Sequence, residues 1–369
     1  MSFLYLTADK VGIITGGGTV TQNESAALQS LGPCKIWDRK ELDKLVGVYV
    51  LPSEIGEPWE QDALANYHLN ITGLKPRLTH IYSGTFSETV AALQKRGSKV
   101  VYTIAAHSVE ASRKAHETFG IDYARCYPHL VEPELWQRYS TGYRLADVLV
   151  CPSKHSYETL RSQGMTQRIE IIPHGCHLPE KVTSLPKRFT CGYLGCCAGP
   201  DKGLIYLLQA WKQLNYKDAT LLLAGRDSTS TFVKQLVEQF GGGCIELVGW
   251  INSISDFYNR LSVYIQPSLT EGFGCEILEG MAYARPVICS TGAGAQDLVE
   301  VNQEQSVEVG ATFSAGNVDH LASLVDRAKN NWDLEILGKQ AWSRAENYTW
   351  TKIKERYLEL WREILGEKE

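Results

Sequence analysis

Short apolar runs alternate with helical stretches along almost the whole chain, and this alternation predicts parallel sheets whose strands are joined by crossover helices. The pattern restarts after Glu180–Lys187, a stretch that is poor in apolar residues. The chain has 369 residues, whereas a single hydrophobic core rarely grows beyond about 250–300 residues. We therefore predict an α/β protein built from two Rossmann-like, doubly wound domains.

The expected elements follow directly from the pattern. The sequence predicts strands at Phe3–Thr7, Val48–Leu51, His80–Tyr82, Val100–Ile104, Val148–Cys151 and Glu170–Ile172, and then at Phe189–Leu194, Thr220–Ala224, Glu246–Val248, Val263–Gln266 and Val287–Cys289. It predicts helices at Ser25–Ser30, Glu88–Arg96, Tyr157–Gln163, Gly203–Leu214, Thr231–Phe240, Ile254–Leu261 and Glu276–Tyr283.

The expected domains are residues 1–180, on the acceptor side, and residues 181–348, on the donor side. Two such domains facing each other would place a ligand cleft at the carboxyl ends of their strands. Residues 349–369 are expected to form a helix at Thr349–Leu365 that packs back on the first domain. Its apolar residues have helical spacing, which is also what any helix packed on a core would show.

Charge and composition argue against several classes of partner. The formal net charge is −5 and no polybasic run occurs, so a nucleic acid partner is not expected and peripheral membrane contact has no support from charge. No apolar run approaches the roughly 18–20 residues that span a bilayer, and no signal peptide is recognisable. The ten cysteines include no C-x-x-C pair. We expect a cytoplasmic protein.

The most informative segment is residues 266–286, in which an apolar strand, a proline, a glycine-bearing loop and a helix follow one another. Such a loop offers free backbone N–H groups and the positive end of a helix dipole to a phosphate. Gly272 and Gly274 would let a ligand approach the backbone.

Two glutamates in this segment are suited to bind a sugar or ribose. Glu271 lies in the loop, and Glu279 lies about one turn into the helix. A carboxylate can accept hydrogen bonds from two hydroxyls of a diol. The alternative makes Glu271 a capping residue and Glu279 a solvated helix charge, but the order of elements around the pair favours a functional interpretation.

The segment resembles the E-x7-E signature of retaining glycosyltransferase family 4, whose members have the GT-B fold. The resemblance covers nearly the whole chain. It extends to Tyr193-Leu194-Gly195 with Asp201-Lys202-Gly203, to residues 221–225 (Leu-Leu-Leu-Ala-Gly), to Ile172-Pro173-His174-Gly175 where the family has I-P-N-G, and to Leu145-Ala146-Asp147 with Cys151-Pro152-Ser153.

The resemblance implies roles for the residues of the second domain. Glu271 would contact the donor sugar hydroxyls and Glu279 the ribose, while Lys202 would bind the diphosphate and stabilise its departure. The backbone of Phe273, Gly274 and Cys275 would assist Glu271.

One departure from the family concerns the diphosphate. The family usually has an arginine directly after the glycine that corresponds to Gly195, and this chain has Cys196 there. Phosphate binding would then depend on Lys202 alone or with help from Arg226. An ordinary surface lysine is the alternative for Lys202, although a cation beside a helix start is unfavourable unless an anion binds nearby.

The first domain offers two weaker candidates. Gly17 and Gly18, in the glycine triplet after the first strand, match the family's glycine loop, although a flexible turn would look the same. His107 matches the family's histidine near the donor sugar, although strand ends often carry a structural histidine. No G-x-G-x-x-G occurs, and no histidine spacing indicates a metal site.

The expected function is transfer of a hexose with retention of configuration, with Glu271, His107 and Lys202 as the catalytic set. The co-substrate would be a UDP- or GDP-sugar, with no other cofactor and no metal, and the acceptor would be a glycan, a lipid-linked molecule or a small molecule. Two alternatives are a non-catalytic GT-B partner protein, and a sugar-nucleotide epimerase or phosphorylase on the same fold.

Overall fold

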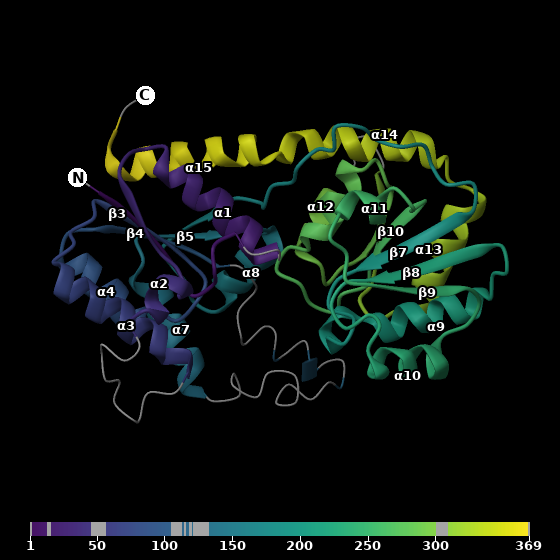
Figure 1. Cartoon of the computed structure of the whole chain (residues 1–369), viewed down its shortest axis with the longest axis horizontal. Helices are drawn as coiled ribbons and strands as arrows, with labels where there is room; N and C mark the ends of the chain where they lie inside the picture. Colours follow the sequence, from purple (N-terminus) through teal and green to yellow (C-terminus); the bar gives the residue numbers. More distant parts are fainter. Residues whose placement is uncertain are drawn as a thin grey trace. The chain divides into compact units, whose positions relative to one another are not determined.

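A computed structural model describes residues 2–12, 16–45, 57–104, 113, 116–117, 120, 133–299 and 309–367. The described residues form two compact units (Figure 1). The first contains Met1–Ala111, Tyr127–His174 and, from the carboxyl end, Trp350–Glu369, and the second contains Ser112–Cys126 and Gly175–Thr349. The predicted strand at Val48–Leu51 and His107 lie outside the described residues.

In its described part, the first unit has a six-stranded parallel sheet in the order β2-β1-β3-β4-β5-β6. Its strands are β1 (Phe3–Thr7), β2 (Cys34–Trp37), β3 (Leu78–Tyr82), β4 (Lys99–Thr103), β5 (Val148–Cys151) and β6 (Arg168–Ile171). Its helices are α1 (Gly16–Gln29), α2 (Arg39–Asp43), α3 (Glu57–Thr72), α4 (Ser87–Lys95), α7 (Pro133–Leu145), α8 (Lys154–Ser162) and α15 (Trp350–Leu365).

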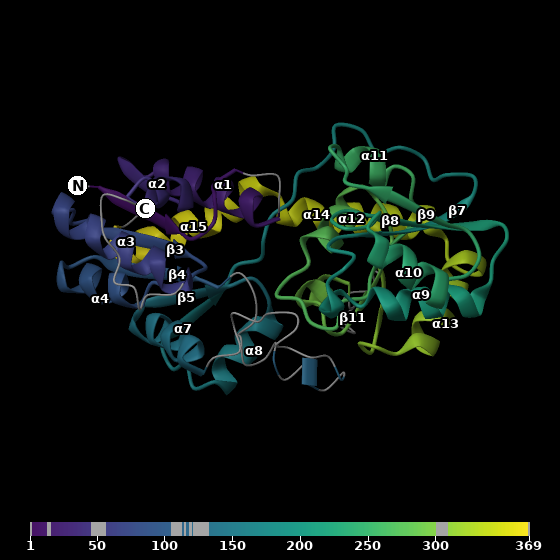
Figure 2. The ribbon, with the colours of Figure 1, turned by 60° about the horizontal axis from the view of Figure 1, so that its bottom comes forward.

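The carboxyl-terminal helix α15 runs beside α1 in this unit (Figures 1 and 2). A buried polar network joins them, because the Tyr357 hydroxyl donates to Glu24 Oε1 at 2.6 Å and the Tyr5 hydroxyl donates to Glu24 Oε2 at 2.9 Å. Trp361 Nε1 donates to His80 Nδ1 at 3.3 Å. These hydrogen bonds satisfy the polar groups of an otherwise apolar contact, as burial requires.

In the part that the structure describes, the second unit repeats this architecture with a six-stranded parallel sheet in the order β12-β11-β10-β7-β8-β9. Its strands are β7 (Phe189–Leu194), β8 (Ala219–Ala224), β9 (Ile245–Gly249), β10 (Val263–Gln266), β11 (Val287–Ser290) and β12 (Gly310–Phe313). Its helices are α9 (Leu204–Leu214), α10 (Thr231–Phe240), α11 (Ile254–Tyr258), α12 (Cys275–Ala282), α13 (Val318–Asn330) and α14 (Leu334–Ala345), with short 3-10 helices η2 (Pro200–Lys202), η3 (Gly294–Leu298) and η4 (Glu346–Tyr348).

Side chains alternate between the two faces of the second sheet, as the period of a strand requires. Along β8, Leu221 and Leu223 pack with α9, α10 and α13, while Leu222 and Ala224 pack with α11, α12 and α14. Figure 1 shows α9 and α10 on one side of this sheet and α12 and α14 on the other. The unit is therefore doubly wound, as predicted.

Two short strands at the sheet edges were not predicted from the sequence. β2 is only Cys34–Trp37 and contains a charged lysine, and β12 is only Gly310–Phe313. Edge strands need only one partner and one buried face, so their sequences carry little of the long apolar signal that identifies central strands.

Candidate functional site

The candidate site is built around the loop between β10 and α12 in the second unit. The N–H of Glu271 donates to the carbonyl of Gly292 at 2.9 Å, and the Glu271 carbonyl accepts from the N–H of Gly294 at 3.0 Å. The Phe273 carbonyl accepts from the N–H of Ala295 at 2.7 Å, and the Phe273 side chain is buried. The loop that follows β11 thus fixes the backbone that carries Glu271.

Gly274 turns this loop into α12. Its φ of +89° lies in the left-handed region, which glycine adopts without a steric penalty. Its carbonyl accepts the first hydrogen bond of the helix, from the N–H of Ile277 at 3.0 Å. The backbone N–H groups of Cys275 and Glu276 therefore lie in the first turn of α12, where the helix dipole favours an anion.

A second loop, after β7, brings Lys202 to the same place. Lys202 ends η2, and Gly203 follows with a φ of +70°. A Cβ at Gly203 would lie 2.0 Å from the carbonyl oxygen of Pro267, so only glycine fits against the β10 loop. The N–H of Leu269 donates to the Asp201 carbonyl at 2.7 Å, which ties the two loops together.

Lys202 and Glu271 form an ion pair between these loops. Their side chains are 24% and 21% exposed, so both remain within reach of a ligand. Burial alone would lower the pKa of Lys202, but the carboxylates of Glu271 and Asp201 outweigh it and raise the pKa of this ammonium above its usual range. Lys202 is therefore held as a cation beside Glu271, the residue expected to bind the donor sugar.

Glu279 lies in α12, and its carboxylate is held by Tyr258. The Tyr258 hydroxyl donates to Glu279 Oε2 at 2.9 Å and contacts the Glu276 carbonyl at 3.1 Å. Burial raises the pKa of Glu279, and the hydrogen bond from Tyr258 partly offsets this. A tyrosine that fixes one carboxylate oxygen leaves the other free to accept from a ligand hydroxyl.

Glu276, in the same helix as Glu279, is a third glutamate of this segment, and the sequence analysis did not identify it as a site residue. Burial, together with the carboxylates of Glu271 and Glu279, raises the pKa of Glu276 to about 7, while Lys202 acts in the opposite sense. The signal was present in the sequence, because a position three residues before Glu279 shares its side of the helix.

Gly195 and Arg226 lie at the carboxyl ends of the neighbouring strands β7 and β8. The N–H of Gly195 donates to the Ala224 carbonyl at 3.1 Å, and the N–H of Cys197 donates to the Arg226 carbonyl at 3.0 Å. The Arg226 side chain is exposed. The thiol of Cys196, the residue at the family's arginine position, lies 3.9 Å from an Asp227 carboxylate oxygen.

The first-unit candidates are less well defined. The structure places Gly17 and Gly18 in the first turn of α1, which is a helix start rather than a flexible turn. The Gly18 carbonyl accepts from the N–H of Gly12 at 3.2 Å and from the Thr21 hydroxyl at 3.0 Å.

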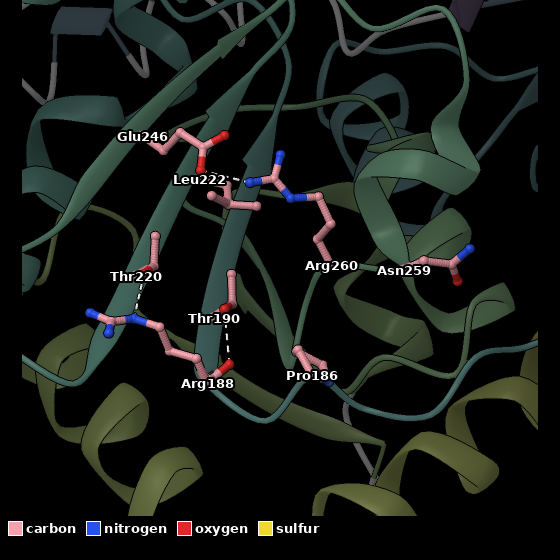
Figure 3. Close-up of a pocket in the computed structure, with 8 residues that line it drawn as sticks. All are labelled: Pro186, Arg188, Thr190, Thr220, Leu222, Glu246, Asn259 and Arg260. Carbon is pink, nitrogen blue, oxygen red and sulfur yellow. Dashed lines mark hydrogen bonds and ion pairs between the residues drawn. The ribbon is translucent and has the colours of Figure 1, made fainter.

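A pocket of about 440 Å³ lies elsewhere in the second unit (Figure 3). It is lined by Pro186, Arg188, Thr190, Thr220, Leu222, Glu246, Asn259 and Arg260. Thr190, Thr220 and Glu246 stand at the second positions of β7, β8 and β9, so the pocket lies at the amino ends of these strands. Parallel α/β sheets bind ligands at the opposite, carboxyl ends, where the loop of Glu271 lies.

Among the described residues, no group of three or more His, Cys, Asp or Glu side chains is arranged to hold a metal ion. None of the described helices combines the length and the apolar character that a bilayer-spanning segment needs.

Comparison with known sequences finds a family model that matches most of the second unit. Residues 188–345 match the family model described as "Glycosyl transferases group 1". An uncharacterized glycosyltransferase of Methanocaldococcus jannaschii is 28% identical over 177 residues, which are 45% of this chain and 44% of that protein. The capsular polysaccharide biosynthesis glycosyltransferase CapM of Staphylococcus aureus is 28% identical over 192 residues, or 49% of each chain. The chain thus spans about half the length of the curated relatives it matches.

Solved structures resemble the chain over nearly its full length. Sucrose-phosphate synthase from Thermosynechococcus elongatus has a TM-score of 0.77 at 19% identity, covering 99% of this chain and 100% of that chain. The Anabaena protein HepE, solved in complex with UDP, has a TM-score of 0.72 at 17% identity, covering 98% and 100%. The chain has the GT-B fold, and the fold predicted from the sequence is confirmed.

Proposed function

We propose that this protein is a retaining glycosyltransferase that moves a hexose from a nucleotide-sugar donor to a hydroxyl of a glycan, lipid-linked or small-molecule acceptor. The observation that carries the proposal is the Lys202–Glu271 ion pair beside the first turn of α12. This pair lies in the segment that matches the glycosyltransferase family model. A cation and a helix amino terminus suit the diphosphate of a nucleotide sugar, and a carboxylate suits the hydroxyls of its sugar.

Each residue of the second unit has a proposed task. Glu271 accepts hydrogen bonds from donor-sugar hydroxyls, aided by the backbone of Phe273, Gly274 and Cys275. Glu279, held at one oxygen by Tyr258, accepts from the ribose. Lys202 turns from Glu271 toward the diphosphate when the donor binds. Gly195 permits close approach of the phosphates, and Arg226 is a second cation for them.

In the proposed reaction the acceptor hydroxyl attacks the anomeric carbon from the side of the leaving group. The bond from the anomeric carbon to the phosphate oxygen breaks, the new glycosidic bond forms on the same face, and the acceptor proton passes to the released diphosphate. Lys202 and the N–H groups of α12 stabilise the charge that develops on that diphosphate. In this scheme they do the work that a divalent metal would otherwise do, so EDTA should not abolish activity.

The proposed donor-side role of the first unit involves Gly17, Gly18 and His107, by resemblance to the family. A UDP-sugar is the first donor to test, because the similar HepE was solved with UDP and with UDP-glucose. A GDP-sugar is the second.

A thermal-shift screen against UDP, GDP, ADP and their common sugar conjugates, with and without EDTA, tests the proposal. We expect saturable stabilisation by one nucleotide family, unchanged by EDTA, of about 2.7 kcal/mol when the ligand is at 100 times its Kd. A protein that responds to none of these compounds would contradict the proposed function.

A second candidate function is a non-catalytic GT-B partner protein, and Cys196 at the family's arginine position is the observation that favours it. Slow hydrolysis of a donor in the absence of acceptor would favour the enzyme. Binding of a protein partner without any affinity for nucleotide sugars would favour the partner protein.

A further inference from the structure

The pocket at the amino ends of β7, β8 and β9 lies on one face of the second sheet (Figure 3). Thr190 of β7 stands in register with Thr220 of β8. Leu222, two residues further along β8, stands in register with Glu246 of β9. Side chains in register, or two residues apart on one strand, point to the same face of a sheet, so these four form one surface. Its volume of about 440 Å³ is within the range of small-molecule sites.

The short helix α11 forms one side of this pocket. It has only five residues, and it and the chain that follows it pack closely on the sheet. A Cβ at Gly192 of β7 would lie 2.4 Å from Leu261 Cδ2 and 2.9 Å from Phe257 Cζ. Asn259 and Arg260, directly after α11, then line the pocket from that side. The pocket is therefore bordered by tightly packed elements rather than by a loose surface loop.

Arg188 is fixed at one end of the pocket. Its Nε donates to the Thr220 hydroxyl at 2.8 Å, and its Nη2 donates to the carbonyls of Lys217 at 2.8 Å and Ala219 at 3.1 Å. These bonds hold one edge of the planar guanidinium. Its Nη1 makes no hydrogen bond to any residue that the structure describes. A donor already held in place loses little conformational freedom when it binds a ligand.

Arg260 lies further along the strands, beside Glu246. Arg260 Nη2 donates to Glu246 Oε2 at 2.6 Å, which uses one nitrogen of the guanidinium and one oxygen of the carboxylate. Asn259 Oδ1 accepts from the Thr183 hydroxyl at 2.9 Å, so the amide NH₂ of Asn259 remains for a ligand. The pocket thus combines the two positive charges of Arg188 and Arg260 with the single negative charge of Glu246.

We propose that this pocket is a second binding site, and that its ligand is a sugar that bears a phosphate or a carboxylate. The free N–H groups of Arg188 and Arg260 suit the anion, because a guanidinium binds phosphate and carboxylate oxygens in pairs. The Thr220 hydroxyl, which accepts from Arg188, keeps its own hydrogen to donate, and Glu246 Oε1 can accept from a sugar hydroxyl. The inference does not depend on the proposed function, because Glu271 and Lys202 lie at the carboxyl ends of the strands.

Isothermal titration of the full chain at pH 7.5 with glucose 6-phosphate, glucuronate, glucose and inorganic phosphate tests this. At least one of the two sugar anions should bind with a Kd below about 1 mM. Glucose and inorganic phosphate should each bind about tenfold more weakly, since each offers only half of the chemistry. Added NaCl should weaken the binding of the sugar anion, because the charges of Arg260 and Glu246 are exposed to solvent.

Two substitutions in the pocket should act in opposite directions. Arg260→Gln removes a charged donor and should weaken binding of the sugar anion about tenfold. Glu246→Gln removes the charge that repels the anion but keeps an oxygen that accepts from a hydroxyl, so it should tighten binding about threefold. The matched control is Arg327→Gln, which removes an exposed arginine from α13 on the other face of the sheet and should change nothing. Thermal unfolding checks that each variant is folded.

A further variant, Lys202→Gln, distinguishes this pocket from the candidate donor site, where a sugar phosphate could also bind. Affinity for the sugar anion that survives Lys202→Gln but falls in Arg260→Gln supports the second site. The opposite result, or unchanged binding in Arg260→Gln, overturns it, as does the absence of binding by both sugar anions. If inorganic phosphate binds as tightly as glucose 6-phosphate, the assignment of a sugar is overturned. None of these outcomes alters the proposed function, which the nucleotide screen tests separately.

Discussion

At the scale of single residues, the candidate site depends on how Glu271 is held. Its backbone is fixed by hydrogen bonds to Gly292 and Gly294, while its side chain pairs with Lys202. Because the backbone contacts do not involve the carboxylate, Glu271→Ala should leave the fold intact. By analogy with the loss of one transition-state contact, it should lower kcat by about 10²–10³.

Steady-state kinetics with the donor found in the screen measure this effect, and thermal unfolding checks the fold. Glu246→Ala is the matched control, because it also breaks an ion pair in the second unit, that with Arg260 at 2.6 Å, but does so at the amino ends of the strands. It should retain the wild-type rate. A Glu271→Ala enzyme with full activity would remove Glu271 from the mechanism.

The sequence analysis singled out Glu271 and Lys202 as site candidates from their chemistry and from the order of the elements around them. Glu271 and Lys202 are far apart in sequence, and the structure brings them into an ion pair. Glu276 was missed because a glutamate in the first turn of a helix is ordinary for capping and dipole reasons. Its raised pKa arises from burial and from Glu271 and Glu279, which only a folded arrangement supplies.

At the scale of elements, the approach of the η2 turn to the β10 loop positions Lys202. A methyl group at Gly203 would collide with the Pro267 carbonyl and would also strain a backbone φ of +70°. Gly203→Ala should therefore push the two loops apart and weaken nucleotide binding. Left-handed strain alone costs about 1–2 kcal/mol, and the free energy of unfolding should fall by more than this because the collision adds to the strain.

Gly97→Ala is a control that isolates the strain from the collision. Gly97 has a φ of +84°, and a Cβ there would meet no atom within 4 Å. Thermal unfolding and donor titration of both variants measure the two effects separately. Equal losses in the two variants, with donor affinity retained in Gly203→Ala, would mean that the loop contact does not position Lys202.

Periodicity predicted the central elements best. The predictions for β5, β7, β10 and α10 match the observed bounds, because these segments have one strong period and clear boundaries. The helix expected at Ser25–Ser30 in fact begins at Gly16. Its first residues are three glycines and a threonine, which have low helix propensity, so the sequence gave no sign of a helix there. Tertiary packing must supply the stability of this first turn.

At the scale of the whole molecule, the chain returns to its first unit after completing the second. Helix α15 follows η4 of the second unit, yet it contributes Tyr357 and Trp361 to the buried network of Glu24 and His80. Helical spacing predicted an apolar face on this helix. It did not predict the buried hydrogen bonds, because the partners of Tyr357 and Trp361 lie about 300 residues away in sequence.

The stability of the whole chain should depend on pH through the buried side chain of His174. His174 is the last residue of the first unit's main segment and is 4% exposed. Burial lowers the pKa of His174 to about 4, although the Glu24 carboxylate acts in the opposite sense. In the unfolded chain a histidine has a pKa of about 6.5. The unfolded state therefore binds more protons than the folded state between these two values, and stability falls as the pH falls through this window.

His174→Asn removes this titration and installs the residue that the resembled family has in its I-P-N-G turn. Between pH 7 and pH 5, the wild type should lose about 2 kcal/mol more of its free energy of unfolding than the variant does. Urea unfolding of both proteins at the two pH values measures the difference, with Glu238→Gln, which removes an exposed carboxylate from α10, as a variant that should follow the wild type. If wild type and His174→Asn lose stability in parallel, His174 is not held neutral by burial.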